Sequence, residues 1–165
     1  MPVTSTCDLC DAHQGDTSGD FRVLPPVFQA FGAITAFAGS VSTVQCLDDN
    51  TSVKQAVESP GHGRVLVVDG GGSLRRALVG GNLAEAAARN GWAGLLVNGC
   101  VRDRAELGTT AIGIRALALM PLPTDRQQAG QVDQPVCLQG LWVRPGDRLV
   151  ADEDGIVVMS RRPGA

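Results

Sequence analysis

The chain of 165 residues has the length of one compact domain, and its 44% hydrophobic and 19% charged residues are ordinary for a globular protein. A net charge of −3 argues against direct binding to nucleic acid or to an anionic membrane, since there is no excess of basic side chains to neutralise phosphates. The apolar runs are far shorter than the roughly 20 residues that cross a bilayer, and residues 1–10 lack the features of a signal peptide, so we expect a cytoplasmic location.

A short helix is expected over residues 5–12, and it contains two of the five cysteines, Cys7 and Cys10. Their CxxC spacing occurs in zinc sites and in redox-active proteins. No second CxxC or histidine pair completes a zinc site, and a redox CxxC normally follows a strand instead of lying near a chain end. We interpret the pair as free thiols, with metal or redox chemistry as the alternative.

A strand, a helix and a second strand follow. Residues 36–46 (AFAGSVSTVQC) are rich in small and β-branched side chains, which favour a strand. The polar run Asp48–Asn50 then offers an N-cap for a helix that extends through Val57. Residues 64–69 (RVLVVD) are a continuous apolar run closed by an aspartate and three glycines. This pattern is typical of a strand buried on both faces, as in a parallel sheet.

The middle of the chain predicts a βαβ unit. Residues 82–90 (NLAEAAARN) are mostly helix formers and are stopped by Gly91, while residues 92–97 (WAGLLV) predict a second buried strand that ends near Gly99. A strand, a helix and a strand within about 35 residues form a crossover between parallel strands.

Further strands are expected in the C-terminal third. Residues 112–120 predict one strand, Pro145–Asp147 predict a turn, and Asp152–Gly155 predict an antiparallel hairpin. The expected fold class is therefore α/β, with a mixed sheet, a few helices and a central βαβ unit. We expect a single domain over residues 1–165.

The βαβ unit is expected to bring two distant segments together. In a parallel pair, the carboxyl ends of the strands and the N-terminus of the connecting helix lie at one edge of the sheet, where α/β proteins bind ligands. The residues placed at this edge are Gly80, Gly81, Asn82 and Leu83, which open the helix, and Arg102 and Asp103, which follow the second strand.

These residues are chemically complementary. The helix N-terminus offers free backbone N–H groups to a carboxylate, and Arg102 can bind the same group bidentately. Asp103 offers an oxygen ligand to Mg²⁺ or Mn²⁺, and Glu106, three residues on, is placed to hold metal-bound water. The alternative is that Arg102 and Asp103 belong to a solvated loop and that Gly80 and Gly81 form a simple turn.

Residues 65–73 (VLVVDGGGS) also resemble the glycine-rich motif of S-adenosylmethionine-dependent methyltransferases. In that motif a helix follows the glycines directly, whereas here residues 73–79 intervene. No acidic residue closes the second strand, where Asn98 and Gly99 stand. A methyltransferase is therefore a remote alternative, and we expect the glycines to allow a tight turn and close packing beneath the site.

Residues 65–103 (VLVVDGGGSLRRALVGGNLAEAAARNGWAGLLVNGCVRD) resemble the family shared by regulator of ribonuclease E activity A and the 4-hydroxy-4-methyl-2-oxoglutarate aldolases. The resemblance extends to both sides of this block and covers most of the chain, through the segments Phe31-Gly32, Phe37-Ala38-Gly39, Thr43–Cys46, Asp49-Asn50, Ile112–Leu117, Pro145–Asp147 and Ala151–Ile156. It implies a β/β/α fold of the swivelling phosphohistidine-domain kind and a ring-shaped homotrimer with sites between subunits.

The resemblance also implies a divalent-metal-dependent class II aldolase. Such an enzyme cleaves 4-hydroxy-4-methyl-2-oxoglutarate to two pyruvates and decarboxylates oxaloacetate. The family's glycine turn, substrate-binding arginine and metal-binding aspartate fall on Gly80–Leu83, Arg102 and Asp103, and Glu106 completes its Arg-Asp-x-x-acid pattern. No side chain stands out as the general base, which leaves that role to metal-bound water or hydroxide. The alternative within the family is a non-catalytic protein that inhibits ribonuclease E by direct contact.

Overall fold

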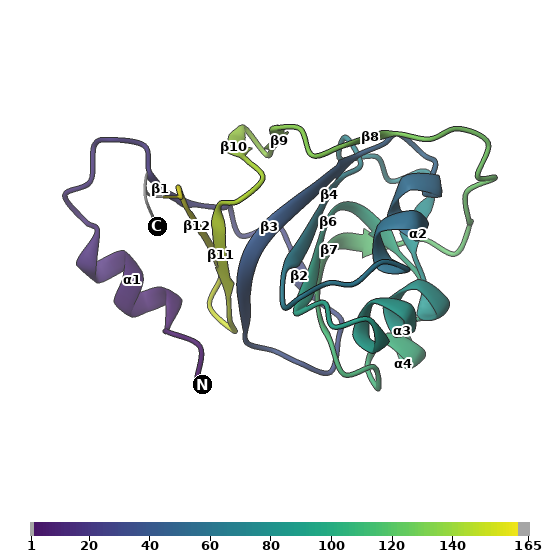
Figure 1. Ribbon diagram of the computed structural model, residues 1–165. Coiled ribbons are helices and arrows are strands. Elements are labelled where there is room, and N and C mark those ends of the chain that lie inside the picture. Colours follow the sequence, from purple (N-terminus) through teal and green to yellow (C-terminus); the bar gives the residue numbers. More distant parts are fainter. Residues whose placement is uncertain (1, 162–165) are drawn as a thin grey trace.

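The computed structural model describes residues 2–161 (Figure 1). Four helices occur in this part of the chain: α1 Thr6–Ala12, α2 Thr51–Val57, α3 Gly81–Arg89 and α4 Arg104–Leu107. The strands described are β1 Phe21–Val23, β2 Gln29–Ala30, β3 Phe37–Gln45, β4 Val65–Asp69, β5 Ala77–Val79, β6 Gly94–Val101, β7 Gly113–Leu119, β8 Gln131–Val132, β9 Val136–Leu138, β10 Leu141–Val143, β11 Arg148–Ala151 and β12 Ile156–Met159.

The main sheet is mixed, as expected for the α/β class. Its strand order is β1-β12-β11-β3-β4-β6-β7-β2, with β5 paired to β6 and β8 paired to β3. Strands β3, β4, β6 and β7 are parallel, whereas β1, β2, β11 and β12 join the sheet antiparallel. Strands β9 and β10 form a separate antiparallel pair.

The parallel strands lie between two hydrophobic cores. Helices α2, α3 and α4 cover one face of these strands, and the C-terminal strands lie on the other side (Figure 1). In β4, Leu66 and Val68 belong to the core beneath the helices, while Val65 and Val67 belong to the core shared with the C-terminal strands. The prediction of a strand buried on both faces is therefore confirmed.

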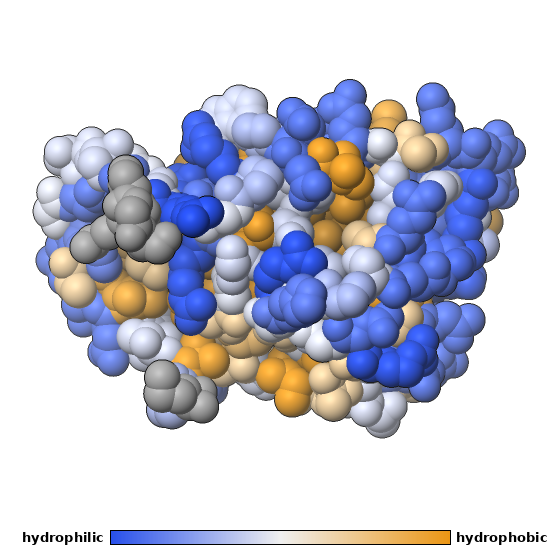
Figure 2. Space-filling model, in the orientation of Figure 1, coloured by the Kyte–Doolittle hydropathy of each residue, from blue (hydrophilic) through white to orange (hydrophobic). Residues whose placement is uncertain are grey.

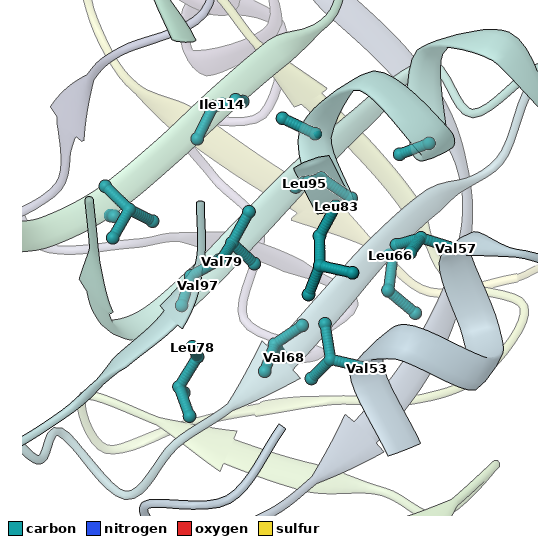
Figure 3. Close-up of a cluster of buried hydrophobic side chains, with 14 of the residues drawn as sticks. Val53, Val57, Leu66, Val68, Leu78, Val79, Leu83, Leu95, Val97 and Ile114 are labelled. Carbon is teal, nitrogen blue, oxygen red and sulfur yellow. The ribbon is translucent and has the colours of Figure 1, made fainter. Parts of the chain in front are cut away.

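Short helices are held on the sheet by apolar side chains rather than by their own length. Val53 and Val57 of α2 and Leu83 of α3 point toward Leu66 and Val68 of the sheet in Figure 3. Isolated helices of seven or nine residues would be marginal in water, so packing is what stabilises them. The surface over this side of the molecule is mainly hydrophilic (Figure 2).

The second core includes a close contact that only glycine permits. The ring of Phe37 lies against Gly94 of β6 and Gly113 of β7. A Cβ would come within 2.3 Å of the ring at Gly94 and within 2.0 Å at Gly113. The two glycines therefore create the space that a phenylalanine fills at the amino ends of β6 and β7.

The sequence-based boundaries need three corrections. Strand β6 begins at Gly94 and runs through Gly99 to Val101, so it is longer than predicted and Trp92 precedes it. The segment between β4 and α3 is not simply a loop, because β5 pairs with the end of β6 there. The very short elements β1, β2, β8, β10 and α4 were not predicted, since two to four residues carry little periodic signal.

Two other expectations are confirmed for the described residues. Cys7 and Cys10 lie on α1, as predicted, and neither forms a disulfide bond. The Gly70–Gly72 stretch forms a tight turn, with positive φ at Gly71 and Gly72 and Gly70 packed against Leu78. None of the helices in residues 2–161 is long and apolar enough to cross a membrane.

Candidate functional site

The structure brings the two predicted segments together. The backbone N–H of Arg102 donates to the carbonyl of Val79 at 2.9 Å, and β5 carries the chain from this contact directly into Gly80. The backbone N–H of Gly81 donates to Oδ2 of Asp103 at 2.8 Å. The start of α3 and the end of β6 are therefore neighbours for two reasons, the parallel crossover that was predicted and the β5 pairing that was not.

Asp103 caps α3 from outside the helix. Its backbone has φ +63, a left-handed conformation that aspartate tolerates better than most residues. Asp103 lies between β6 and α4, and in this conformation its side chain points back toward Gly81. Among residues 2–161 no group hydrogen bonds to the second oxygen, Oδ1, which remains available to a ligand.

The first turn of α3 also has free donors. Gly80 is the N-cap and has no side chain, and the first hydrogen bond within the helix is from Ala84 to the Gly80 carbonyl at 3.1 Å. No acceptor in the described chain pairs with the backbone N–H groups of Asn82 and Leu83. These two donors, at the positive end of the helix dipole, suit a carboxylate or another oxyanion.

A cavity of about 310 Å³ lies over these groups, at the small end of the range for ligand pockets. Arg102 borders it with a half-buried side chain whose Nη1 donates to the Pro121 carbonyl at 3.3 Å. Arg102 Nε lies 4.0 Å from Asp103 Oδ2, so the two side chains form only a loose ion pair. The full lining is Asn50, Ala77, Gly80, Asn82, Leu83, Arg102, Asp103, Pro123, Thr124, Asp125 and Arg126.

Glu106 does not line this cavity. It borders an adjoining hollow together with Gly81, Glu85 and Arg89. Its carboxylate lies against Gly81, where an added Cβ would come within 1.9 Å of Oε2. The structure therefore places Glu106 next to the start of α3 but on the other side of Gly81 from the Arg102 cavity.

Asn50 and the β7–β8 loop were missed as parts of the site. Asn50 is buried, and its side-chain N–H donates to the Leu78 carbonyl at 2.9 Å. Its Oδ1 accepts hydrogen bonds from Thr124 Oγ1 at 2.7 Å and from Arg126 Nε at 3.0 Å. The sequence signal was present, because β3 is parallel to β4 and its polar end, Asp48–Asn50, must lie at the same edge of the sheet.

Asp49 fastens this loop. Its Oδ2 accepts from the backbone N–H groups of Gln127 at 2.6 Å and Gln128 at 2.8 Å, and its Oδ1 accepts from Thr51. Partial burial raises the pKa of the Asp49 carboxyl, but these hydrogen bonds outweigh that effect and lower the pKa to about 2. Asp49 is therefore ionised at neutral pH and connects α2 to the loop.

The carboxylates at the cavity could bind a hard divalent cation only if water molecules supply its remaining ligands. No group of three or more His, Cys, Asp or Glu side chains is placed to hold a metal among the described residues. Mg²⁺ commonly binds through one or two carboxylates and several waters, and Asp103 with its free Oδ1 meets that requirement. Asp125, on the opposite segment of the lining, is the other carboxylate at the cavity.

Comparison with known proteins gives the family. Residues 6–158 match the model of the RraA-like family, described as Aldolase/RraA. The chain belongs to the RraA-like family. This confirms the resemblance inferred from residues 65–103 and the segments on either side of them.

Relatives in the RraA-like family have different names. A protein of Albidiferax ferrireducens named "putative 4-hydroxy-4-methyl-2-oxoglutarate aldolase" is 61% identical, over 98% of both chains. The solved structure of the RNA-processing inhibitor RraA from Thermus thermophilus is 44% identical with a TM-score of 0.90, over 100% of this chain and 97% of that one. A Geobacillus kaustophilus structure named as an S-adenosylmethionine:2-dimethylmenaquinone methyltransferase is 38% identical with a TM-score of 0.88, over 97% of both chains.

Proposed function

We propose that this protein is a divalent-metal-dependent aldolase that cleaves 4-hydroxy-4-methyl-2-oxoglutarate to two molecules of pyruvate and also decarboxylates oxaloacetate. The observation that carries the proposal is the convergence of Asp103, Arg102 and the free N–H groups of Asn82 and Leu83 on one small cavity. The name of the 61% identical relative supports the same substrate. The proposal includes a cytoplasmic location and assembly as a homotrimer. Light scattering would check the mass of the trimer.

The reaction needs stabilisation of negative charge next to a carboxylate. Cleavage breaks the bond between C3 and C4, removes the proton of the 4-hydroxyl group and leaves the electron pair on C3, conjugated with the 2-oxo group. A proton then adds to C3, so both fragments are pyruvate. In oxaloacetate the same bond breaks with release of CO₂, and the same charge develops.

The chain's own groups are placed to bind and stabilise that charge. The N–H groups of Asn82 and Leu83 would bind the carboxylate next to the 2-oxo group. Arg102 would donate to the same end of the substrate and stabilise the 2-oxo oxygen as it becomes negative. The N–H groups are fixed before the substrate binds because α3 is packed on the sheet, whereas the Arg102 side chain has one 3.3 Å hydrogen bond to the Pro121 carbonyl and can adjust to the substrate.

Asp103 would hold the metal, and Glu106, from the adjoining hollow, would contact it only through bound water. A divalent cation bound there would supply a second positive charge to the 2-oxo acid. The choice between Mg²⁺ and Mn²⁺ is a matter for the assay, because both prefer oxygen ligands. The described side chains include no histidine at the cavity, which leaves a water molecule as the proposed proton acceptor.

The test is release of pyruvate from both substrates, with and without Mg²⁺ or Mn²⁺. We expect activity that is abolished by chelation, restored by metal and lost in Asp103→Ala. Glu153→Ala, which removes an exposed carboxylate away from this cavity, is the matched control and should retain activity. Pyruvate release that survives both chelation and Asp103→Ala would refute the metal-dependent mechanism.

A second function is favoured by one comparison. The Thermus structure that matches all of this chain is named as an RNA-processing inhibitor. Inhibition of ribonuclease E by surface contact would not require the carboxylate of Asp103, so wild type and Asp103→Ala should inhibit the nuclease equally. Inhibition by both, together with no pyruvate release by either, would identify the protein as a regulator rather than an enzyme.

The methyltransferase alternative has little geometric support despite the name of the Geobacillus relative. The Gly70–Gly72 turn leads into β5 instead of into a helix, so no helix N-terminus follows the glycines. In addition, Gly70 is packed against Leu78 and the Asn98 carbonyl, which fills the space beside it. Calorimetry with S-adenosylmethionine should therefore detect no binding.

A further inference from the structure

A second arginine borders the same cavity as Arg102. Arg126 belongs to the loop between β7 and β8, whereas Arg102 follows β6. The roles proposed for Arg102 and for the start of α3 use only one end of a 2-oxo acid. The cavity therefore contains a second cationic group to which the proposed mechanism gives no role.

Arg126 is oriented by a buried partner. Its Nε donates to Oδ1 of Asn50 at 3.0 Å, and the Asn50 side chain is itself fixed because its N–H donates to the Leu78 carbonyl. Only Nε is used in this way. Within residues 2–161 no acceptor pairs with the two terminal nitrogens of Arg126, so they are free to bind an anion bidentately.

The backbone at this position is also held in an uncommon conformation. Arg126 has φ +51, and a non-glycine residue in the left-handed region needs support from its surroundings. Hydrogen bonds from Gln127 and Gln128 to Asp49 give that support immediately after it, and the bond from Ala77 N–H to the Leu122 carbonyl at 2.8 Å gives it before. The loop is therefore fixed on both sides of Arg126, which keeps this residue at the border of the cavity.

We propose that Arg126 binds the distal carboxylate of the substrate and makes the enzyme selective for dicarboxylic 2-oxo acids. The inference rests on the proposed function and extends it, since Arg102 and the start of α3 would bind the carboxylate next to the 2-oxo group. Asn50 would act as a positioning residue through Arg126 Nε.

The negative charge of Asp125 means that Arg126 attracts a carboxylate strongly only at short range. Asp125 precedes Arg126 and lines the same cavity, so the region is not broadly positive. A carboxylate gains there only when it pairs directly with the guanidinium group, because at longer range the two charges largely cancel. Selectivity should therefore depend on the guanidinium group itself more than on net charge.

The experiment compares two substrates that differ only in the distal group. One is 4-hydroxy-4-methyl-2-oxoglutarate, and the other is 4-hydroxy-4-methyl-2-oxopentanoate, in which a methyl group replaces the distal carboxylate. Arg126→Gln should lower kcat/KM for the dicarboxylate by roughly 10- to 100-fold, mainly through KM, and change the value for the monocarboxylate analogue less than about twofold. Arg126→Lys should restore only part of the loss, because an ammonium group cannot bind a carboxylate bidentately.

The control is Arg148→Gln, which removes an equal charge from an exposed position in β11 that does not line the cavity. The ribbon of β11 lies away from α3 (Figure 1). Equal loss on both substrates in Arg126→Gln, or no loss on either, would refute the inference. Oxaloacetate decarboxylation, measured on the same variants, distinguishes failure of this inference from failure of the proposed function. If wild type releases pyruvate from oxaloacetate but Arg126→Gln keeps the wild-type substrate preference, only the present inference fails. If wild type acts on none of the three acids, the proposed function fails and this inference with it.

Discussion

Gly80→Ala is expected to disable the site while leaving the fold intact. Gly80 has φ −125 and ψ −166, an extended conformation that alanine adopts freely, so the effect is steric. The new Cβ would lie 2.7 Å from Asp103 Oδ2, 3.2 Å from Arg102 Cγ and 3.3 Å from Arg102 Nε. Both side chains are partly exposed and can move away, but only by leaving the positions from which they would act.

The size of the effect follows from these distances. Ordinary contact begins near 3.4 Å, so Asp103 must move by about 0.7 Å, and its 2.8 Å hydrogen bond to Gly81 would be stretched beyond a useful length. A displacement of this order costs about 100-fold in a reaction that depends on positioning. Stability should change by only about 1 kcal/mol, since the lost hydrogen bond is offset by the lower entropy of the unfolded chain.

The assay is kcat/KM for pyruvate release, with the midpoint of thermal unfolding measured on the same samples. Gly15→Ala is the control, because a Cβ at Gly15 meets nothing within 4 Å. We expect a loss of roughly 100-fold in Gly80→Ala, with a midpoint within about 4 °C of wild type. Wild-type kcat/KM in a folded Gly80→Ala protein would refute the steric argument, and a much larger fall in the midpoint would show that the fold itself had been damaged.

Three further predictions concern stability, measured by urea unfolding. Because the pKa of Asp49 is lowered from 3.8 to about 2, its stabilisation is complete above about pH 5 and is lost as the pH falls through about 2. The stabilisation by Asp49 should amount to about 1 kcal/mol after solvent screening, and Asp49→Asn should remove its dependence on acid pH. An unchanged pH profile of stability in Asp49→Asn would contradict this prediction. Asp147→Ala leaves the buried guanidinium of Arg22 without its 3.2 Å ion pair and should cost roughly 3–5 kcal/mol, so a cost below about 1 kcal/mol would show that the pair contributes little. Gly113→Ala drives a methyl group into the ring of Phe37 and should cost roughly 1–3 kcal/mol, which Phe37→Leu in the same chain should partly restore.

The strongest sequence predictions came from long apolar segments and from the geometry of parallel strands. The run at residues 65–69 is hydrophobic on both faces because it lies between two cores, which is the pattern typical of a central strand in a parallel sheet. If this strand is parallel to the second strand, predicted at residues 92–97, then Gly80–Leu83 and Arg102–Asp103 must share an edge of the sheet. The structure places them there, while their chemical roles stay predictions.

The missed parts of the site are those that depend on tertiary contacts. The loop that contains Thr124 and Arg126 has no periodic pattern, and its conformation is set by bonds to Asp49 and Asn50, far away in the sequence. Residues 77–79 form a strand that the sequence does not predict, because three residues carry almost no strand signal, although they bring Gly80 to Arg102. Glu106 was placed near Asp103 by its spacing of three residues and by the family's Arg-Asp-x-x-acid pattern, and neither could reveal that Glu106 borders a different hollow, beside Gly81.

The contact between Asp49 and the β7–β8 loop has a consequence for the order of folding. It joins groups 78 and 79 residues apart, and it can form only after β3 and β7 have been aligned by the strands between them. Closing so long a segment for two hydrogen bonds is unfavourable until the sheet exists. We therefore expect the Arg126 rim of the cavity to form late during folding and to open first, with amide hydrogen exchange at Gln127 and Gln128 faster than in β4. Equal protection at both places would show that the rim and the sheet form as one unit.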